Sequence, residues 1–306
     1  MRDHQSISLQ LIAGRGVSRI TGRIPRYLAK LRANPAWLAM YIFGRLMPVR
    51  KAHWLTAKAA PSSSPQPTMF ADVTCESAVE ALRCDGLFIG ISLPKQICAD
   101  IASFAERTTC FAGSNRKVEF LPDEHGEAEQ RFNQAILNGN YFEKVLECDA
   151  LRAVQRDPLL QDIAAHYLGG QARLSAARVW WTFPTMLASA AEKRLASQDE
   201  YHFDLLDWRM VKFFFHLKPV DEGSGPHVYV RGSHKRRALR HQLTPFIGHP
   251  VDDVLRVYGA DKPVTLLGDA GFGFVEDPFG FHRATIAELT PRLMMEIAFG
   301  VSPRFV

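Results

Sequence analysis

The stretch Tyr201-His202-Phe203-Asp204 contains residue types from which proteins build transition-metal sites. In a strand, side chains two residues apart point to the same face, so His202 and Asp204 would project an imidazole and a carboxylate side by side. Both groups are good ligands for a divalent transition metal. Alone, this spacing is a weak signal, because such pairs are more often surface residues or simple hydrogen-bonding partners.

A third ligand would have to come from a different strand, and His282 is the candidate. Two imidazoles and one carboxylate on one face of an octahedron leave three positions open, which is the arrangement of non-haem Fe(II) oxygenases. Ten residues later, Arg292 opens an apolar strand. A guanidinium next to the metal could hold the far carboxylate of a dicarboxylate cosubstrate through paired hydrogen bonds. The alternative for Arg292 is a salt bridge at the rim of the fold.

The elements that must position these residues divide into helices followed by strands. Helical patterns cover 76–82, which ends at Asp85-Gly86, then 96–107 after Pro94, and 124–168. Beyond residue 170, β-branched and aromatic residues alternate with Gly, Pro and Asp turns, which predicts short strands. The predicted strands are 87–91, 173–183, 201–217, 227–231, 264–267, 272–275 and 293–301. This order favours an α+β fold over a wound parallel sheet.

The first sixty residues differ in charge from the rest of the chain. They contain eleven Lys and Arg and a single acid, a net charge of +10, whereas the remainder has a net charge of −5. Residues 24–47 have helical periodicity broken at Pro35, and the Pro- and Ser-rich stretch 59–67 is typical of a linker. We therefore predict a basic helical extension with its linker over 1–66 and a main domain over 67–306. The extension is expected to pack on the main domain; contact of residues 1–60 with an anionic membrane surface or a protein partner is the alternative.

Composition excludes several classes of protein. The 306 residues are 47% hydrophobic and 23% charged, which is typical of a globular chain rather than a disordered or fibrous one. Because the part after residue 60 is mildly acidic, no nucleic-acid partner is expected. Five cysteines without a CxxC pair argue against a disulfide framework and favour a reducing compartment, so we predict a cytoplasmic protein. No apolar run approaches the roughly 18 residues that cross a bilayer. The Arg-rich start is also compatible with an organellar transit peptide.

Several short stretches occur in a specific order along the chain. They are Asp85-Gly86-Leu87-Phe88-Ile89, Pro94, Asp157-Pro158-Leu159 through Leu168-Gly169, Tyr201-His202-Phe203-Asp204, Gly225-Pro226, Arg231-Gly232-Ser233-His234-Lys235, Gly268-Asp269-Ala270, His282 and Arg292. Each stretch is modest, but the ordered series resembles the phytanoyl-CoA dioxygenase-like family of Fe(II)/2-oxoglutarate oxygenases. The resemblance covers about residues 78–303.

This resemblance implies a double-stranded β-helix, a jelly roll with helices packed on its outer sheet. It implies Fe(II) as the metal and 2-oxoglutarate as the cosubstrate. His202, Asp204 and His282 would be the iron ligands. Arg292 would contact the C5 carboxylate of 2-oxoglutarate.

Two further positions are assigned to the cosubstrate site by the resemblance. Trp208 matches a tryptophan found in some relatives, with plain core packing as the alternative. Relatives often have Ser or Thr two residues after the distal histidine, but this chain has Ala284 there, followed by Thr285. Any hydroxyl contact would therefore come from Thr285. Arg231 replaces the usual proline before Gly-Ser-His, which is expected to matter little to the chemistry.

The remaining histidines of the strand region are expected to be structural. His216 is predicted to be a core histidine with its hydrogen bonds satisfied, and His234 a turn residue. His227 is predicted to be half-buried and hydrogen-bonded, although it could instead face a substrate.

Together these features predict a dioxygenase that uses O2 and 2-oxoglutarate to hydroxylate an unactivated C–H bond of a small lipid-like or secondary-metabolite substrate. Succinate and CO2 would be released. Desaturation, epoxidation and ring closure remain open, whereas halogenation is disfavoured because Asp204 is present. The alternative from another class is a non-catalytic jelly-roll binding or scaffold protein with a membrane- or partner-binding basic N-terminus.

Overall fold

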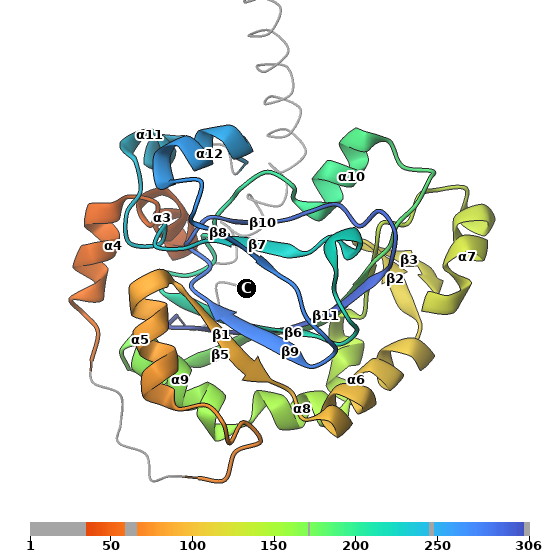
Figure 1. The fold of residues 1–306 in the computed structure, drawn as a ribbon, viewed down its shortest axis with the longest axis horizontal. Coiled ribbons are helices and arrows are strands. Elements are labelled where there is room, and N and C mark those ends of the chain that lie inside the picture. The colour runs from red at the N-terminus through yellow and green to blue at the C-terminus, as the bar shows by residue number, and fades with distance from the viewer. Residues whose placement is uncertain (1–34, 59–65, 171, 245–247, 303–306) are drawn as a thin grey trace, which may run out of the picture.

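Two antiparallel sheets face each other (Figure 1). The computed structural model describes residues 35–58, 66–170, 172–244 and 248–302. The strands are β1 (Leu87–Ser92), β2 (Cys110–Ala112), β3 (Asn115–Phe120), β4 (Asn138–Asn140), β5 (Arg173–Thr182), β6 (Met210–His216), β7 (His227–Val230), β8 (Pro263–Leu266), β9 (Phe272–Glu276), β10 (His282–Ala284) and β11 (Arg292–Gly300). The large sheet has the order β1-β9-β6-β11-β5-β4-β2-β3, and the small sheet has the order β10-β7-β8.

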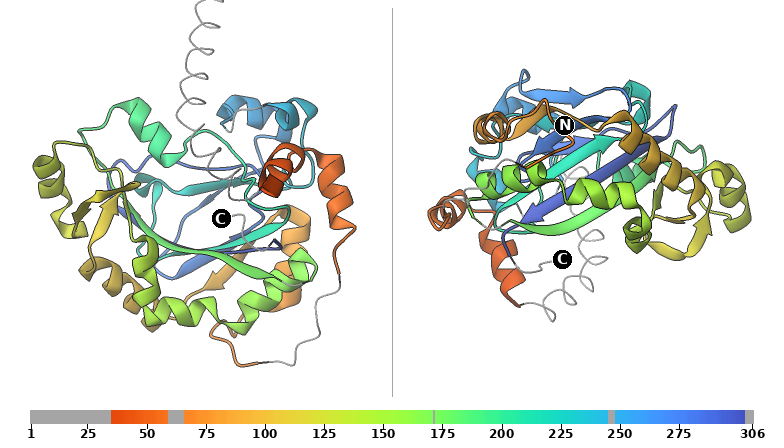
Figure 2. Two further views of the ribbon diagram at one scale, coloured as in Figure 1. Left: turned by 180° about the vertical axis from the view of Figure 1, so that it is seen from behind. Right: turned by 90° about the horizontal axis from the view of Figure 1, so that it is seen from below.

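Helices cover the outer faces of both sheets. They are α3 (Pro35–Phe43), α4 (Met47–Trp54), α5 (Cys75–Asp85), α6 (Lys95–Arg107), α7 (His125–Phe132), α8 (Asp149–Gln155), α9 (Pro158–Leu168), α10 (Ala190–Ser197), α11 (Leu239–Leu243) and α12 (Val251–Tyr258). Helices α5, α6, α8 and α9 lie on the large sheet, and α11 and α12 lie over the small one (Figures 1 and 2). None of the helices in the described ranges is long and apolar enough to span a bilayer.

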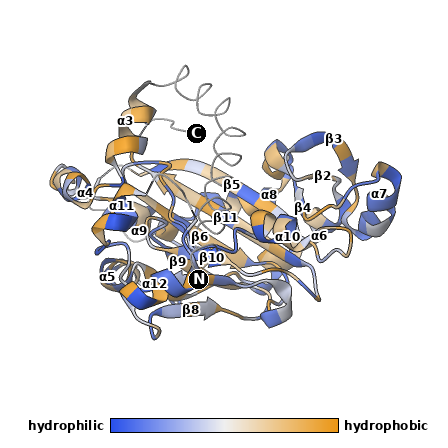
Figure 3. Cartoon of the chain, turned by 90° about the horizontal axis from the view of Figure 1, so that it is seen from above, coloured by the Kyte–Doolittle hydropathy of each residue, from blue (hydrophilic) through white to orange (hydrophobic). Residues whose placement is uncertain are grey.

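Strand β11 shows how the sheet separates an apolar layer from a polar interior. Leu293 and Met295 belong to the apolar cluster beneath the helices, whereas Met294 packs with residues of the small sheet. Because alternate residues of a strand share a face, Arg292 and Glu296 point between the sheets with Met294. All nine residues of the strand are buried. Figure 3 shows the hydrophobic colouring concentrated along the sheets, while α7 at the periphery is hydrophilic.

Most predicted elements are confirmed, with shifts of a few residues at their ends. Helix α5 ends at Gly86, which takes the left-handed conformation with φ of 75°, and α6 begins directly after Pro94. The strand predicted over 87–91 forms as β1, but only Leu87 and Ile91 are buried, so it is less buried than expected.

The helical prediction for 124–168 is wrong in its middle, where β4 pairs with both β2 and β5. Gly139 lies at the centre of β4, and a Cβ there would come within 2.7 Å of the Cys110 sulfur on β2. This close approach of two strands is a tertiary contact that helical periodicity does not reveal.

The single strand predicted over 201–217 is also wrong, because the chain crosses from one sheet to the other within it. Tyr201 and His202 form isolated bridges beside the small sheet, and pairing with the large sheet begins only at β6. Asp207 anchors the crossing: its carboxylate accepts hydrogen bonds from the backbone N–H groups of Val301 and Ser302 at 2.8 and 2.9 Å.

The described part of the predicted N-terminal extension contacts the main domain. Trp37 and Met40 of α3 are buried, and the Arg50 guanidinium of α4 lies 3.6 Å from the ring centroid of Phe279. The Lys58 N–H donates to the Gly169 carbonyl at the end of α9. Residues 24–34 of the predicted helix and 59–65 of the predicted linker lie outside the described residues. The division at residue 66 therefore stays a prediction.

Asp157 fixes the beginning of α9. Its carboxylate accepts hydrogen bonds from the Leu159 N–H (2.9 Å), the Thr68 hydroxyl (2.7 Å) and the Met69 N–H (2.9 Å), and its side chain is buried. Pro158 occupies the first helical position, where its missing N–H costs nothing.

We predict that Asp157→Ala lowers the free energy of unfolding by about 2–4 kcal/mol, because it removes a helix cap and leaves buried donors unpaired. Urea denaturation measures the loss. Asp72→Ala, at an exposed aspartate before α5, is the matched control and should change little. Equal midpoints for the Asp157 variant and the wild type would contradict the role of this cap.

Candidate metal centre

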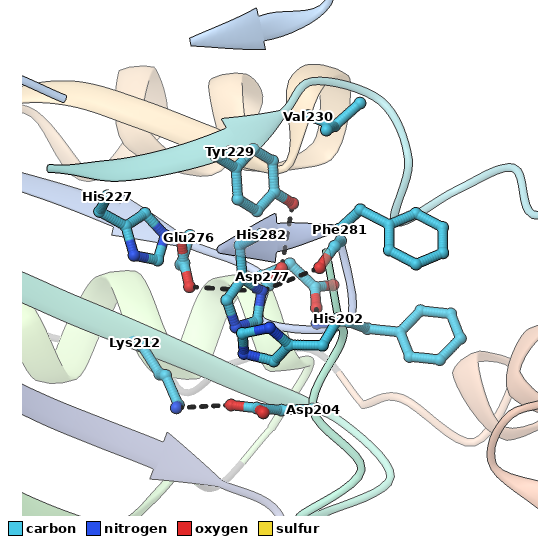
Figure 4. Close-up of polar contacts among 12 residues, drawn as sticks. His202, Asp204, Lys212, His227, Tyr229, Val230, Glu276, Asp277, Phe281 and His282 are labelled. Atoms are coloured by element: carbon cyan, nitrogen blue, oxygen red, sulfur yellow. Dashed lines mark hydrogen bonds and ion pairs between the residues drawn. The ribbon is translucent and has the colours of Figure 1, made fainter. Parts of the chain in front are cut away.

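His202 and His282 lie directly opposite each other beside the small sheet (Figure 4). The two residues exchange both backbone N–H···O bonds, each 2.9 Å long. Directly opposed residues of an antiparallel pair place their side chains on the same face. The two imidazole centroids are accordingly only 4.4 Å apart. Backbone pairing thus brings together two histidines that are distant in the sequence.

Asp204 completes a group of three potential metal ligands. Its backbone N–H donates to the Pro278 carbonyl at 2.8 Å, which holds it beside the segment that leads to His282. One ligand atom each from His202, Asp204 and His282 lie within 4.8 Å of one another. The structure therefore brings together the three residues singled out from the sequence.

Both imidazoles are held in one orientation by backbone carbonyls. Nδ1 of His202 lies 3.1 Å from the Glu200 carbonyl oxygen, and Nδ1 of His282 lies 3.0 Å from that of Gly280. A carbonyl only accepts hydrogen bonds, so Nδ1 carries the hydrogen and the Nε2 lone pair remains for a metal. Burial lowers the pKa of both rings, that of His282 to about 3, so both are neutral near pH 7.

Asp204 is held by a chain of alternating buried charges. Lys212 Nζ lies 2.6 Å from Asp204 Oδ2 and 3.5 Å from Glu296, which in turn pairs with Arg178. Burial alone would raise the pKa of Asp204, but the Lys212 ammonium and the two imidazoles hold it well below its usual range. The carboxylate is therefore ionised. Sequence reasoning missed Lys212, although a lysine within the apolar run Met210–His216 was a visible signal.

A second carboxyl group, Glu276, lies between the His227 and His282 rings (Figure 4). Its Oε2 is 2.8 Å from His227 Nε2, and its Oε1 is 3.9 Å from His282 Nδ1 and has no hydrogen bond. Burial raises the pKa of Glu276 to about 7 and lowers that of His227 to about 3. His227 is therefore neutral near pH 7, and Glu276 takes up a proton far more readily than an exposed glutamate. The expectation that His227 is hydrogen-bonded is confirmed, although the residue is more buried than predicted.

Arg292 is a buried cation that lacks an acidic partner among the described residues. Its guanidinium donates to the Gly225 carbonyl and, at 3.4 Å, to the Thr182 hydroxyl, while its Nε has no partner. Burial lowers its pKa to about 10. A salt bridge at the rim, the alternative to cosubstrate binding, does not form with any described acid.

His216 on the neighbouring strand shares this unsatisfied environment. Neither ring nitrogen makes a hydrogen bond of good geometry, although the Gly268 backbone lies nearby. Burial and the positive charge of Arg292 lower the His216 pKa to about 4. The prediction that His216 is a core histidine is confirmed, because the residue is fully buried, but its ring nitrogens lack the predicted hydrogen bonds of good geometry. Two buried groups with unused hydrogen-bonding atoms, Arg292 and His216, therefore lie on neighbouring strands of the large sheet.

The other two residues assigned to the cosubstrate have different surroundings. Trp208 stacks on His53 of α4 with ring centroids 4.9 Å apart. The Thr285 hydroxyl lies 3.3 Å from the Pro226 carbonyl, to which it donates. A role for either residue in cosubstrate binding stays a prediction.

Comparison with known proteins defines the fold. No family model and no curated protein sequence matches the chain. Among solved structures, the epimerase SnoN from nogalamycin biosynthesis, in complex with Fe3+, alpha ketoglutarate and nogalamycin RO, is 17% identical. The match covers 74% of this chain and 82% of SnoN with a TM-score of 0.52. HygX from Streptomyces hygroscopicus, with nickel, 2-oxoglutarate and hygromycin B bound, is 14% identical. That match covers 75% of this chain and 88% of HygX with a TM-score of 0.50. The chain thus has the jelly-roll-like fold of these structures, which confirms the predicted jelly-roll core with its helices, whereas the basic N-terminal extension stays a prediction.

Because the pKa of Glu276 is raised in the folded protein, we expect the free energy of unfolding to depend on pH. In the unfolded chain the carboxyl titrates near 4.5, whereas in the folded protein it titrates at about 7. The folded state therefore binds this proton more tightly. Its contribution to stability is complete below pH 4.5 and is lost as the pH rises through about 7.

Glu276→Gln, which keeps a donor toward His227, should remove this loss in chelator-treated protein. The difference in free energy of unfolding between the variant and wild type should therefore be more favourable to the variant at about pH 8 than at about pH 5. Urea denaturation at both pH values measures this change. Glu127→Gln, at an exposed glutamate of α7, is the control. An offset between Glu276→Gln and wild type that is identical at both pH values would show that folding does not raise the pKa of Glu276.

Proposed function

We propose that the protein is an Fe(II)- and 2-oxoglutarate-dependent dioxygenase, related to the phytanoyl-CoA dioxygenase-like enzymes that its motifs resemble. The observation that carries the proposal is the convergence of the His202, Asp204 and His282 ligand atoms within 4.8 Å. When bound, Fe(II) and 2-oxoglutarate would together activate O2 and oxidise a substrate C–H bond, with release of succinate and CO2.

The chemistry of the donor set fits a divalent iron ion. Neutral imidazoles from His202 and His282 and an ionised carboxylate from Asp204 form the set that non-haem Fe(II) oxygenases use. Lys212 occupies Oδ2 of Asp204 and leaves Oδ1 for the metal. The backbone carbonyls on Nδ1 keep both rings aimed at the same point, so this chain supplies orientation before any metal arrives.

The unpaired Arg292 fits one end of the cosubstrate. A buried guanidinium is costly without a counter-charge, and the C5 carboxylate of 2-oxoglutarate would supply one. His216, with its unused ring nitrogens beside Arg292, would add a hydrogen bond to the same carboxylate. Thr285 and Trp208 are retained as further contacts of the cosubstrate on the strength of the motif resemblance.

Apolar side chains between the sheets keep water away from this interior. Phe214 and Phe274 stack on each other at 5.0 Å, and each lies within 5.5 Å of the His227 ring, measured between centroids. Met294 and Leu266 belong to the same cluster. Exclusion of water strengthens the hydrogen bonds that orient the site and protects the reaction from side products.

The substrate is proposed to be a small organic molecule, either lipid-like or a secondary metabolite. SnoN and HygX were solved with nogalamycin RO and hygromycin B, respectively, which supports a small-molecule substrate at the level of the fold. Hydroxylation is the proposed outcome, and Asp204 occupies the position that a halide would need in a halogenase. A complete ligand set with an unpaired Arg292 argues against the alternative of a non-catalytic binding or scaffold protein.

The proposal predicts succinate release from 2-oxoglutarate by the Fe(II)-loaded protein under air, increased by a substrate drawn from a panel of lipids and secondary metabolites. Asp204→Ala should lower that release by at least about 100-fold, because it removes a metal ligand. Asp261→Ala, at an exposed turn carboxylate, is the matched control and should retain activity. Full turnover by the Asp204 variant, with its fold verified by circular dichroism, would refute the proposed ligand.

A further inference from the structure

A second group of potential metal ligands lies on the other side of the small sheet. His241 of α11, His249 and Asp253 of α12 each offer a ligand atom, and these atoms lie within 4.8 Å of one another. Helices α11 and α12 cover the small sheet on the side away from the large sheet (Figure 1). Among the described residues, this group and the one around His202 are the two such clusters.

His249 contributes an unused ligand atom to this cluster. Its side chain is only 3% exposed, and its Nε2 is buried without a hydrogen-bond partner. Its ring lies 4.7 Å from that of His241, centroid to centroid. A buried polar atom without a hydrogen-bond partner lowers the stability of the fold. Because Nε2 of His249 lies beside two other potential ligands, we infer that a bound ion supplies the missing partner.

The other two ligands are already aligned with each other. His241 Nε2 lies 2.7 Å from Asp253 Oδ2, and His241 Nδ1 lies 3.0 Å from the Tyr258 hydroxyl. A hydroxyl can donate or accept, so Tyr258 can serve either tautomer of His241. When a metal replaces the hydrogen on Nε2, Nδ1–H can donate to Tyr258, which is the usual outer support of a metal-bound histidine.

Arginines near the cluster oppose a cation, and one of them also contacts a proposed ligand atom. Arg240 and Arg256 lie 2.6 and 3.7 Å from Asp253 Oδ1, and both side chains are more than half exposed. They hold the oxygen that does not face His241. Arg240 Nε also donates a long hydrogen bond of 3.5 Å to His241 Nε2. The positive charge of buried Arg237 helps to lower the pKa of His249, after burial and His241. These charges weaken binding of a cation, and solvent screens the two exposed ones.

The cluster connects segments that support the first site. The His249 backbone exchanges hydrogen bonds with Tyr201 at 2.7 and 3.0 Å, and Tyr201 precedes His202 in the chain. On the other side, Gln242, next to His241, accepts a hydrogen bond from the Met47 N–H of α4. A cross-link here would fix α11 and α12 to the segment that carries His202.

We propose that His241, His249 and Asp253 form a second, structural site for a divalent transition metal of the Zn(II) type. Two imidazoles and one carboxylate are ligands that Zn(II) accepts, with metal–ligand distances of about 2.0–2.2 Å and a fourth position filled by water. To admit the ion, the side chains must open the His241–Asp253 hydrogen bond and the longer contact of Arg240 Nε with His241 Nε2.

The test uses full-length protein in which Asp204→Ala and His282→Ala disable the first site. After treatment with a chelator and equilibration with Zn(II) alone, this background should retain about one equivalent of Zn(II) per chain. Zn(II) should also raise its thermal midpoint. Because the readout is metal content rather than turnover, the result is independent of the proposed function.

Two further variants in the same background locate the ion. His249→Gln and Asp253→Asn should each abolish both the bound Zn(II) and the shift of the thermal midpoint. Asp253→Asn keeps the size of the side chain and a hydrogen bond to His241, so it remains informative if His249→Gln does not fold. His53→Gln, at a histidine outside both clusters, is the control and should retain the equivalent.

Arg240→Gln separates a metal site from a simple ion-pair network. Removal of this positive charge should tighten Zn(II) binding several-fold, whereas a network without metal predicts no change in Zn(II) content. Absence of Zn(II) from the background protein would overturn the proposal. Retention of Zn(II) by both His249→Gln and Asp253→Asn would overturn it as well.

Discussion

The backbone pairing of His202 with His282 is the constraint on which the candidate site depends. Because these residues exchange both hydrogen bonds, a slip of one position would turn one imidazole to the opposite face. Asp204 follows two residues after His202. Its backbone N–H donates to the Pro278 carbonyl, which holds the Asp204 carboxylate beside the two imidazoles. The two sheets, the helices on the large sheet and the crossing anchored at Asp207 all serve to keep these two segments in register.

The interior between the sheets contrasts paired charges with unpaired ones. Asp204 and Glu296 share Lys212, and this pairing offsets much of the cost of burying ions. Arg292 has no such compensation within the described chain, and neutral His216 on the neighbouring strand has ring nitrogens without a hydrogen bond of good geometry. Native proteins tolerate unsatisfied buried groups mainly where function requires them. An anion that enters beside Arg292 would therefore complete the interior rather than disturb it.

The sequence alone was enough to single out the three residues that converge in the structure, together with Arg292, because their types and order are themselves distinctive. It could not identify Lys212 or Glu276, since their importance depends on which strands are neighbours: β6 pairs with both β9 and β11, which places Lys212 opposite Glu276 and Ala298. The prediction of a single strand over 201–217 was wrong for a related reason. Its apolar and aromatic residues continue through the crossing between the sheets without a turn signal. The hydrogen bonds that hold the crossing at Asp207 come from Val301 and Ser302, at the far end of the chain.

The central claim is that this site binds Fe(II) and 2-oxoglutarate together. Anaerobic titration of 2-oxoglutarate into the Fe(II)-loaded protein, followed by visible absorption, tests it directly, because chelation of iron by the cosubstrate gives a charge-transfer band. The wild-type protein should give the band, and His282→Ala should lose it. Arg292→Leu should give the band only at higher 2-oxoglutarate concentration. A wild-type protein that binds Fe(II) but gives no band at any 2-oxoglutarate concentration would contradict the account.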